Sequence, residues 1–399
     1  MSLSQGRRYL AIPGPSVVPD RVLAAMHRAS PNIYEGDLHD VTATILGDLR
    51  RVAGTAAHVA IYIANGHGAW EAANANLFSR GDRALVLATG TFGTSWASSA
   101  QRMGVEVTLL DFGKQSRADA GRTADALKAD RERKIKAVLL THVDTASTVR
   151  NDVAEIRAAI DSTGHPALLA VDCIASLGCD AFNMDDLGVD VTVAASQKGL
   201  MLPPGLGFLW FSDRALERCG GADLRTPYWD WQARAFAGEY WQYFCGTAPT
   251  QHLYGLREAL TMLLAEEGLP HAWARHDCLA RAVWAAVDAW GRGGDIALHV
   301  PAASERGRAV TALRIGGGGA QQLRGWCEAA AGVTLGVPLG MALPDEPAYA
   351  DYLRLAHMGH VNAHMTLGVL SVLEAGMLAL GLPHGAGALD AATAVIAAG

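Results

Sequence analysis

Short apolar runs follow one another between residues 58 and 212, and most of them are separated by segments with helical periodicity. The seven runs lie at 58–64, 83–89, 105–111, 135–143, 167–172, 189–196 and 207–212. Between them, segments such as 69–79 and 152–164 carry apolar residues at the spacing of an amphipathic helix. Nearly continuous apolar strands that alternate with helices are typical of a parallel sheet covered on both faces. The pattern therefore predicts an α/β fold with a mostly parallel, seven-stranded sheet.

The last third of the chain has a different pattern. Residues 256–291 form a long helical pattern that is interrupted by a glycine and a proline, which predicts a bent connection. Short strand patterns at 310–315, 333–337 and 352–358 then alternate with helical patterns at 320–332 and 366–381. We interpret this region as a smaller α+β domain. The predicted organisation is an N-terminal segment of residues 1–19, a large domain of residues 20–255 and a small C-terminal domain of residues 256–399.

Composition and charge narrow the class of protein. The chain has 399 residues, is 50% hydrophobic and carries a formal net charge of -7, so it has no electrostatic footprint for nucleic acid. The N-terminus lacks the apolar core of a signal peptide, and charged residues, glutamine or glycine interrupt each candidate membrane span. The six cysteines form no CxxC pair and the 14 histidines form no HExxH, so no metal site is predicted. We expect a cytoplasmic protein without nucleic-acid or membrane partners.

One lysine stands apart from the others. The chain has five lysines, and four of them lie in one charged stretch, residues 114–136. The fifth, Lys198, follows an apolar, β-branched run and precedes a proline-glycine turn. Loss of hydration in such surroundings lowers the pKa of an amine and makes it the kind of nucleophile that forms Schiff bases with carbonyls. The alternative is a lysine at a strand end whose ammonium group reaches water.

Two further features fall where ligands bind in α/β folds. The turn NGHGAWEAA, residues 65–73, joins a predicted strand to a helix, and backbone N–H groups at such a helix start bind phosphate. Asp172 ends a buried strand, at the edge where open α/β sheets bind their ligands. Each feature also has an ordinary interpretation, as a plain strand-to-helix turn and as a helix N-cap.

Together the three features indicate one chemistry. Lys198 follows Asp172 by 26 positions, one strand–loop–strand later, so both side chains are expected at the same sheet edge. A Schiff-base lysine, a carboxylate for a protonated ring nitrogen and a phosphate-binding turn are the anchors that pyridoxal phosphate requires.

The chain resembles the class V aminotransferases of pyridoxal-phosphate fold type I, in particular the alanine/serine–glyoxylate aminotransferase group. The resemblance runs nearly end to end and rests on motifs in the family's order. These are PGPSVVPDRVLAAM, GHGAWEAA, RGDRALVLATGTFG, THVDTAS, VDCIASLG, GVDVTVAASQKGLMLPPGLGF and YLRLAHMGHVN. The SQKxLxxPPGL element, which contains Lys198, is the most specific of them.

The resemblance implies a role for each site residue. Lys198 would form the Schiff base and carry the substrate proton, and Asp172 would keep the pyridine nitrogen protonated. Arg354 would bind the substrate carboxylate, for which a planar guanidinium is well suited. The remaining cofactor contacts would be Asn65, Gly66, His67 and Gln197 at the phosphate, Phe92 stacked on the ring, and Thr247 reaching the phosphate of the neighbouring subunit of a homodimer.

Some positions depart from the family pattern. Ala146 stands where many relatives have a hydroxyl that contacts the cofactor ring, so Thr145 or Ser147 must serve, and we predict Thr145. Near the N-terminus, Tyr34 and Glu35 lie where glyoxylate-using relatives often carry HRSP, which leaves the amino donor open. Arg314 is an alternative, less favoured carboxylate binder.

The predicted function is ping-pong transamination from a small amino acid (alanine, serine or aspartate) to glyoxylate or pyruvate, with pyridoxal 5'-phosphate as cofactor. One alternative is a pyridoxamine–pyruvate aminotransferase, which needs no phosphate anchor. Cysteine desulfuration is disfavoured because relatives with that activity usually have histidine before the lysine, where this chain has Gln197. An NAD-dependent dehydrogenase is disfavoured because GHGAWE does not fit GxGxxG.

Overall fold

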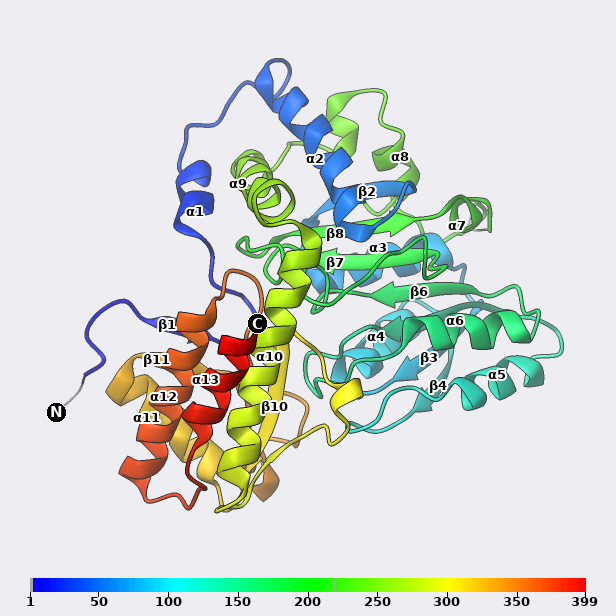
Figure 1. Ribbon diagram of the computed structural model, residues 1–399. Helices are drawn as coiled ribbons and strands as arrows, with labels where there is room; N and C mark the ends of the chain where they lie inside the picture. Colours follow the sequence, from blue (N-terminus) through cyan, green and yellow to red (C-terminus); the bar gives the residue numbers. More distant parts are fainter. Residues whose placement is uncertain (1–2, 219) are drawn as a thin grey trace.

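A seven-stranded sheet forms the centre of the large unit in the computed structural model, which describes residues 3–218 and 220–399 (Figure 1). The strand order is β2-β8-β7-β6-β5-β3-β4, and only β8 runs antiparallel to its neighbours. The strands are β2 (His58–Ala64), β3 (Arg83–Ala88), β4 (Glu106–Asp111), β5 (Ile135–Thr141), β6 (Leu168–Asp172), β7 (Val191–Ala195) and β8 (Gly205–Phe211). The predicted seven-stranded, mostly parallel sheet is confirmed.

Helices cover both faces of this sheet, as its continuous apolar strands require. Successive residues of β5 enter different cores, because neighbouring side chains of a strand point to opposite faces. Val138 and Leu140 pack with α2, α5 and α6, whereas Ala137 and Leu139 pack with α3 and α4. The helices of the large unit are α1 (Asp20–Met26), α2 (Asp37–Ala53), α3 (Gly66–Leu77), α4 (Thr91–Arg102), α5 (Ala120–Ala129), α6 (Val153–Ser162), α7 (Asp213–Arg218), α8 (Trp231–Ala235) and α9 (Thr250–Leu260), with a 3-10 turn at Tyr240–Tyr243.

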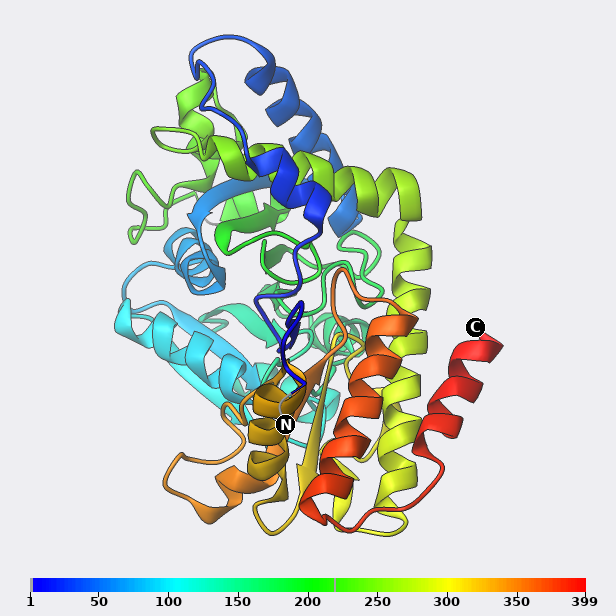
Figure 2. The ribbon, with the colours of Figure 1, turned by 90° about the vertical axis from the view of Figure 1, so that its left-hand side faces the viewer.

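The C-terminal unit has its own sheet and its own hydrophobic core. Its antiparallel sheet has the order β12-β10-β9, formed by Tyr352–Ala356, Val310–Ile315 and Ile296–Leu298. Its helices are α10 (Leu269–Gly291), α11 (Gly319–Ala331), α12 (Ala363–Leu380) and α13 (Ala388–Ala398), with short 3-10 turns at Ala303–Glu305 and Pro347–Asp351. The N-terminal strand β1 (Tyr9–Ala11) pairs in parallel with β11 (Val333–Leu335), so the first residues of the chain lie against the C-terminal unit (Figure 2).

The bent connection between the two units has a local cause. α9 continues into a π-helical turn, Thr261–Glu267, and Gly268 then takes a positive φ of 82° before α10 starts with Pro270 in its first turn. The glycine permits the change of direction, and the proline fits a helix start because it lacks an N–H to leave unpaired. The predicted domain boundary at residues 255–256 falls inside α9 and stays a prediction.

Within the described residues, α12 alone has the length and apolar composition to cross a membrane. Its residues Val369, Leu370, Leu373 and Met377 are buried in the core of the C-terminal unit, where α12 packs against α10, α11 and α13. Such packing is also expected of a core helix in a small domain.

Candidate active site

The carboxyl ends of β6 and β7 bring the two central residues together. These strands pair in parallel with Asp172 opposite Val193, and Lys198 follows the end of β7. Both side chains therefore reach the same edge of the sheet, as the sequence spacing predicts. This is the edge at which open α/β sheets bind ligands.

Lys198 is buried, with 8% of its surface exposed, so it does not reach water as the alternative interpretation required. Its Nζ donates to the main-chain oxygen of Pro13. Burial is the main cause that lowers the pKa of the amine to about 8, and the positive charge of Arg354 adds to it. A Cβ placed on Gly14 would lie 2.5 Å from Lys198 Nζ, so a larger residue at that position would displace the end of the lysine side chain.

Asp172 is a buried carboxyl group with two donors. Oδ1 accepts the backbone N–H of Ile174 at 2.7 Å, and Oδ2 accepts the indole N–H of Trp70 at 3.0 Å. Burial raises the pKa of this carboxyl to about 7, although both hydrogen bonds act in the opposite direction. The residue caps no helix, so the N-cap interpretation is wrong. The sequence analysis did not single out Trp70, which lies in the second turn of the helix that begins at the glycine turn.

The glycine turn begins α3, and its N-terminus is partly satisfied by the chain itself. Asn65 caps the helix, with its Oδ1 accepting the N–H groups of His67 at 3.1 Å and Gly68 at 3.3 Å. An added Cβ on Gly66 would lie 2.5 Å from the Ile174 side chain, which shows how closely this turn approaches the segment after Asp172. The ordinary capped turn is thus present at the place where the phosphate turn was predicted.

Gln197, which directly precedes Lys198, adds an unsatisfied polar group. Its amide oxygen is buried and has no hydrogen-bond partner among the described residues. Buried polar atoms without partners are rare in folded proteins, and each one suggests a missing ligand or water.

Phe92 and Thr145 are joined through a buried aspartate that the sequence analysis did not single out. Asp144 accepts backbone N–H groups from two segments, at Phe92 and Gly93 and at Ala146 and Ser147. It therefore fixes the start of α4 against the loop after β5. The Phe92 ring meets Trp70 edge-on at 6.2 Å, which places it at the same edge of the sheet as Asp172.

Arg354 lies in β12 and is 4% exposed. Its Nε donates to Val337 O and its Nη1 to Thr145 O, both at 2.8 Å, so the guanidinium is held in place by main-chain oxygens rather than by a carboxylate. Burial lowers the pKa of Arg354 to about 10. Arg314, in contrast, makes a two-point contact with Asp295 at 2.6 and 2.9 Å, and this pairing occupies the alternative carboxylate binder.

Five predicted positions are exposed: Asn65 and His67 at the start of α3, and Thr247, Tyr34 and Glu35 elsewhere. Thr247 is exposed and does not cap α9, which begins at Thr250 after Pro249. Tyr34 is 85% exposed, and Glu35 is exposed beside it. Residues whose roles require a neighbouring subunit are expected to lie on the surface of a single chain.

Comparisons with known proteins agree with this geometry. The family described as Aminotransferase class-V matches residues 8–335. The chain is 39% identical over 72% of its length to a serine–glyoxylate aminotransferase of Methylorubrum extorquens, of which the match covers 72%. It is 34% identical over 93% of its length to an L-aspartate–glyoxylate aminotransferase of Paracoccus denitrificans, of which 91% is covered. The solved pyridoxamine–pyruvate aminotransferase of Mesorhizobium loti is similar over the full length of both chains, with a TM-score of 0.87 and 25% identity.

Proposed function

Because the chain belongs to the class V aminotransferases, we propose that it uses pyridoxal phosphate to pass an amino group from a small amino acid to a small 2-oxo acid. Alanine, serine or aspartate are the proposed donors, and glyoxylate or pyruvate the proposed acceptors. The relatives that are named for serine–glyoxylate and aspartate–glyoxylate transfer support this substrate range. The observation that carries the proposal is the buried amine of Lys198 at the same sheet edge as the buried carboxyl of Asp172.

The residues at this edge fit the cofactor. Asp172 is a buried acid that has no cationic hydrogen-bond partner in the part of the chain that the structure describes, and a protonated ring nitrogen would supply one. The amide oxygen of Gln197 has no partner among the described residues, and the start of α3 is the kind of helix N-terminus that binds phosphate. Lys198 supplies the amine. A buried acid and a buried amine each lose hydration on folding, so each gains from a partner that restores its charge.

We propose the following contacts. Asn65, Gly66, His67 and Gln197 hold the phosphate, Asp172 holds the ring nitrogen, Phe92 covers the ring, and Thr145 contacts the ring hydroxyl. Ser147 is less suitable than Thr145, because it is fully buried and its hydroxyl accepts the N–H of Val149. When bound, the cofactor serves as a sink for the electron pair of the substrate's Cα–H bond.

The chain's own residues then bind the substrate and move its proton. Arg354 presents a fixed guanidinium to the substrate carboxylate, which orients Cα beside Lys198. Lys198 Nζ takes the proton from the substrate Cα. The same amine would then deliver that proton to C4′, the cofactor carbon that carries the amino group after transfer. With a pKa of about 8, a useful fraction of this amine is unprotonated near neutral pH, as a general base requires.

We further propose that the active enzyme is a cytoplasmic homodimer. Thr247 is exposed, and the segment before it exposes two large aromatic side chains, Trp241 at 56% and Phe236 at 55%. Large exposed aromatic side chains favour association. In a dimer, the Thr247 hydroxyl would reach the phosphate site of the neighbouring subunit.

The likeness to the pyridoxamine–pyruvate enzyme makes that reaction the second candidate. A vitamer substrate without a phosphate would not need the unpartnered amide of Gln197 or the glycine turn. These two features therefore favour the phosphate-bearing cofactor.

The visible spectrum of the purified protein tests the proposal. Bound pyridoxal phosphate is expected to absorb near ~400 nm, and alanine, serine, aspartate and pyridoxamine are then added singly without an acceptor. Loss of the band with an amino acid supports the proposal, whereas a response to pyridoxamine alone supports the second candidate. The band should vanish in Lys198→Ala and persist in Lys136→Ala, whose side chain is 50% exposed. If no band forms even after incubation with pyridoxal phosphate, the cofactor assignment is wrong.

A further inference from the structure

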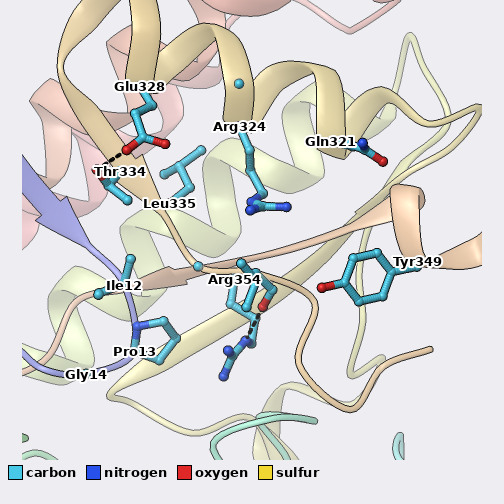
Figure 3. Close-up of a pocket in the computed structure, with 13 residues that line it drawn as sticks. Ile12, Pro13, Gly14, Gln321, Arg324, Glu328, Thr334, Leu335, Tyr349 and Arg354 are labelled. Atoms are coloured by element: carbon cyan, nitrogen blue, oxygen red, sulfur yellow. Dashed lines mark hydrogen bonds between the residues drawn. The ribbon is translucent and has the colours of Figure 1, made fainter. Parts of the chain in front are cut away.

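A cavity of about 640 Å³ lies between α11, the segment after β11 and the N-terminal segment (Figure 3). Its wall contains the arginines Arg324 and Arg354, the acid Glu328, the hydroxyls of Tyr349 and Thr334, and the amide of Gln321. The proposed mechanism uses only Arg354 among these.

The cavity adjoins the candidate active site at two points. Arg354, the proposed carboxylate binder, forms part of its wall. Gly14 also lines it, and the space where a Cβ on Gly14 would lie is 2.5 Å from Lys198 Nζ. The cavity wall therefore contains one residue of the site, Arg354, and one residue, Gly14, that lies next to the reactive amine.

Arg324 is a cation without a partner in this cavity. Its Nε is buried and has no hydrogen-bond partner, and no carboxylate of the described residues lies within ion-pair distance of its guanidinium. Its side chain points from α11 toward the middle of the cavity, and the Tyr349 hydroxyl points in from another side (Figure 3). Burial is the main cause that lowers the pKa of Arg354. The charge of Asp144 acts in the opposite direction, and the smaller effect of the Arg324 charge lowers this pKa further, so the two cations interact unfavourably.

The one acid in the wall does not neutralise this pair. Glu328 lies one helical turn after Arg324, but its Oε1 accepts from the Thr334 hydroxyl at 3.4 Å and its carboxylate is turned toward that residue (Figure 3). The cavity wall thus contains two positively charged residues and one negatively charged residue. A second anionic group on the substrate would remove the repulsion and satisfy the buried Nε.

We propose that Arg324 binds the second carboxylate of a dicarboxylic substrate, so that an aspartate-like amino acid or the corresponding oxo acid is a preferred substrate. One carboxylate binds Arg354, the second binds Arg324 with help from the Tyr349 hydroxyl, and the amino-bearing carbon lies toward Lys198. Arginine suits both positions through charge-assisted, two-point contacts with carboxylates. Alanine and serine would leave Arg324 facing the cavity without a partner, and sites that leave buried polar groups unpaired discriminate strongly. This inference rests on the proposed aminotransferase function and narrows its donor.

The test compares aspartate with alanine in the half-reaction without acceptor. For Arg324→Gln, the ratio of kcat/KM for aspartate to kcat/KM for alanine should fall between about 10-fold and about 100-fold, mostly through KM. Glu328→Gln should raise the same ratio, because it removes the negative charge from the wall. Arg314→Gln is the matched control: it deletes an arginine from the same unit whose partner is Asp295, and it should leave the ratio unchanged.

Binding provides a readout that does not depend on the cofactor. Succinate should bind the cofactor-free protein at least about 10-fold more tightly than propionate by calorimetry, and Arg324→Gln should abolish that preference. If Arg324→Gln does not fold, Arg324→Lys and the comparison of succinate with propionate on the unaltered protein decide the question.

The outcomes separate this inference from the proposed function. The second-carboxylate role is refuted if Arg324→Gln lowers kcat/KM for alanine and aspartate equally, or if it lowers kcat/KM for neither substrate. The aminotransferase assignment stands in both cases, provided that the alanine reaction proceeds. Equal affinity for succinate and propionate also refutes it. If no amino acid changes the spectrum of the cofactor-loaded protein, the proposed function itself fails.

Discussion

Replacing Trp70 by Phe removes a single hydrogen bond from the carboxyl group at the centre of the site. The indole N–H of Trp70 donates to Asp172 Oδ2 at 3.0 Å, and Phe keeps an aromatic ring in the same apolar surroundings but has no donor. Asp172 retains its contact with the Ile174 N–H at 2.7 Å. The substitution therefore asks how much one neutral donor contributes to keeping this buried acid ionised.

The structure sets the size of the effect. A hydrogen bond to a charged group contributes roughly 1.5–3 kcal/mol, and a tenfold change in an equilibrium corresponds to about 1.4 kcal/mol. Both Trp70 and Asp172 are buried, so water replaces little of the lost interaction. Loss of the donor should raise the pKa of Asp172 above its value of about 7 by about one to two pH units. At pH 8 the acid would then be largely neutral and unable to pair with a protonated ring nitrogen.

The assay is the affinity of the cofactor-free protein for pyridoxal phosphate between pH 5 and pH 9, at conditions chosen to keep the protein folded. The pH of half-maximal affinity should move upward in Trp70→Phe. Trp96→Phe is the matched control, because Trp96 stacks on Trp70 with ring centroids 6.0 Å apart but donates to Asn74 Oδ1 at 3.1 Å instead. Both variants lose similar buried volume, and only one loses a donor to Asp172.

An unchanged midpoint in Trp70→Phe would refute the reasoning. So would an equal shift in both variants, because the effect would then come from lost ring volume rather than from the hydrogen bond. A uniform loss of affinity at every pH would likewise show that Trp70 only packs.

Three other predictions address the amine, its neighbour and the acid. Gly14→Ala should slow capture of pyridoxal phosphate by Lys198 at least about 10-fold, because the added Cβ would meet Nζ at 2.5 Å. Gly36→Ala is the control: Gly36 has nearly the same φ (106° against 104°) and nothing within 4 Å of its Cβ, so this variant should capture the cofactor at the normal rate. Equal slowing in both variants would assign the effect to backbone strain. In the cofactor-free protein, labelling of Lys198 by a small amine reagent, followed by mass spectrometry, should show a midpoint near pH 8, as its lowered pKa requires; a midpoint near the ordinary 10.5 would contradict the buried state of the amine. Folding raises the pKa of Asp172 from 3.8 to about 7, so between these two pH values the folded chain holds a proton that the unfolded chain has released. The stability of the cofactor-free protein therefore falls as the pH rises from 3.8 to about 7, and it stays lower above that range. Asp172→Asn should therefore stabilise the cofactor-free protein at pH 8 by up to about 4 kcal/mol and much less at pH 4, measured by urea unfolding; the same effect at both pH values would contradict the raised pKa.

The fold was largely predictable because its strands are apolar on both faces. β6 and β7 are buried along their whole length, and such runs have few other structural solutions. The prediction was weakest where the pattern is polar. The charged stretch of residues 114–136 includes α5, a helix that the pattern did not predict, which Asp119 caps and which buries Leu127 in the core. A short helix with one buried stripe gives a weak signal in a charged stretch.

The site divides in a similar way. The pairing of Lys198 with Asp172 was accessible from spacing, because parallel strands place their ends at one edge. The roles of Trp70 and Asp144 could not be predicted, because a tryptophan or an aspartate near a turn gives no sign of its hydrogen-bond partner in another segment. Arg314 and Arg354 lie in similar apolar runs, and only their surroundings separate them: Asp295 neutralises one, while main-chain oxygens hold the other in place.

The sequence by itself determined the sheet, the functional residues at the ends of its strands and the identity of the reactive amine. Hydrophobic periodicity and residue type are local properties of the chain. The tertiary structure alone decided which groups lack partners. Burial of Lys198 and Asp172, the donor from Trp70 and the unpaired Nε of Arg324 all depend on contacts between segments far apart in the chain. Charge and hydrogen-bonding energies depend on distance and on exclusion of water, and folding sets both.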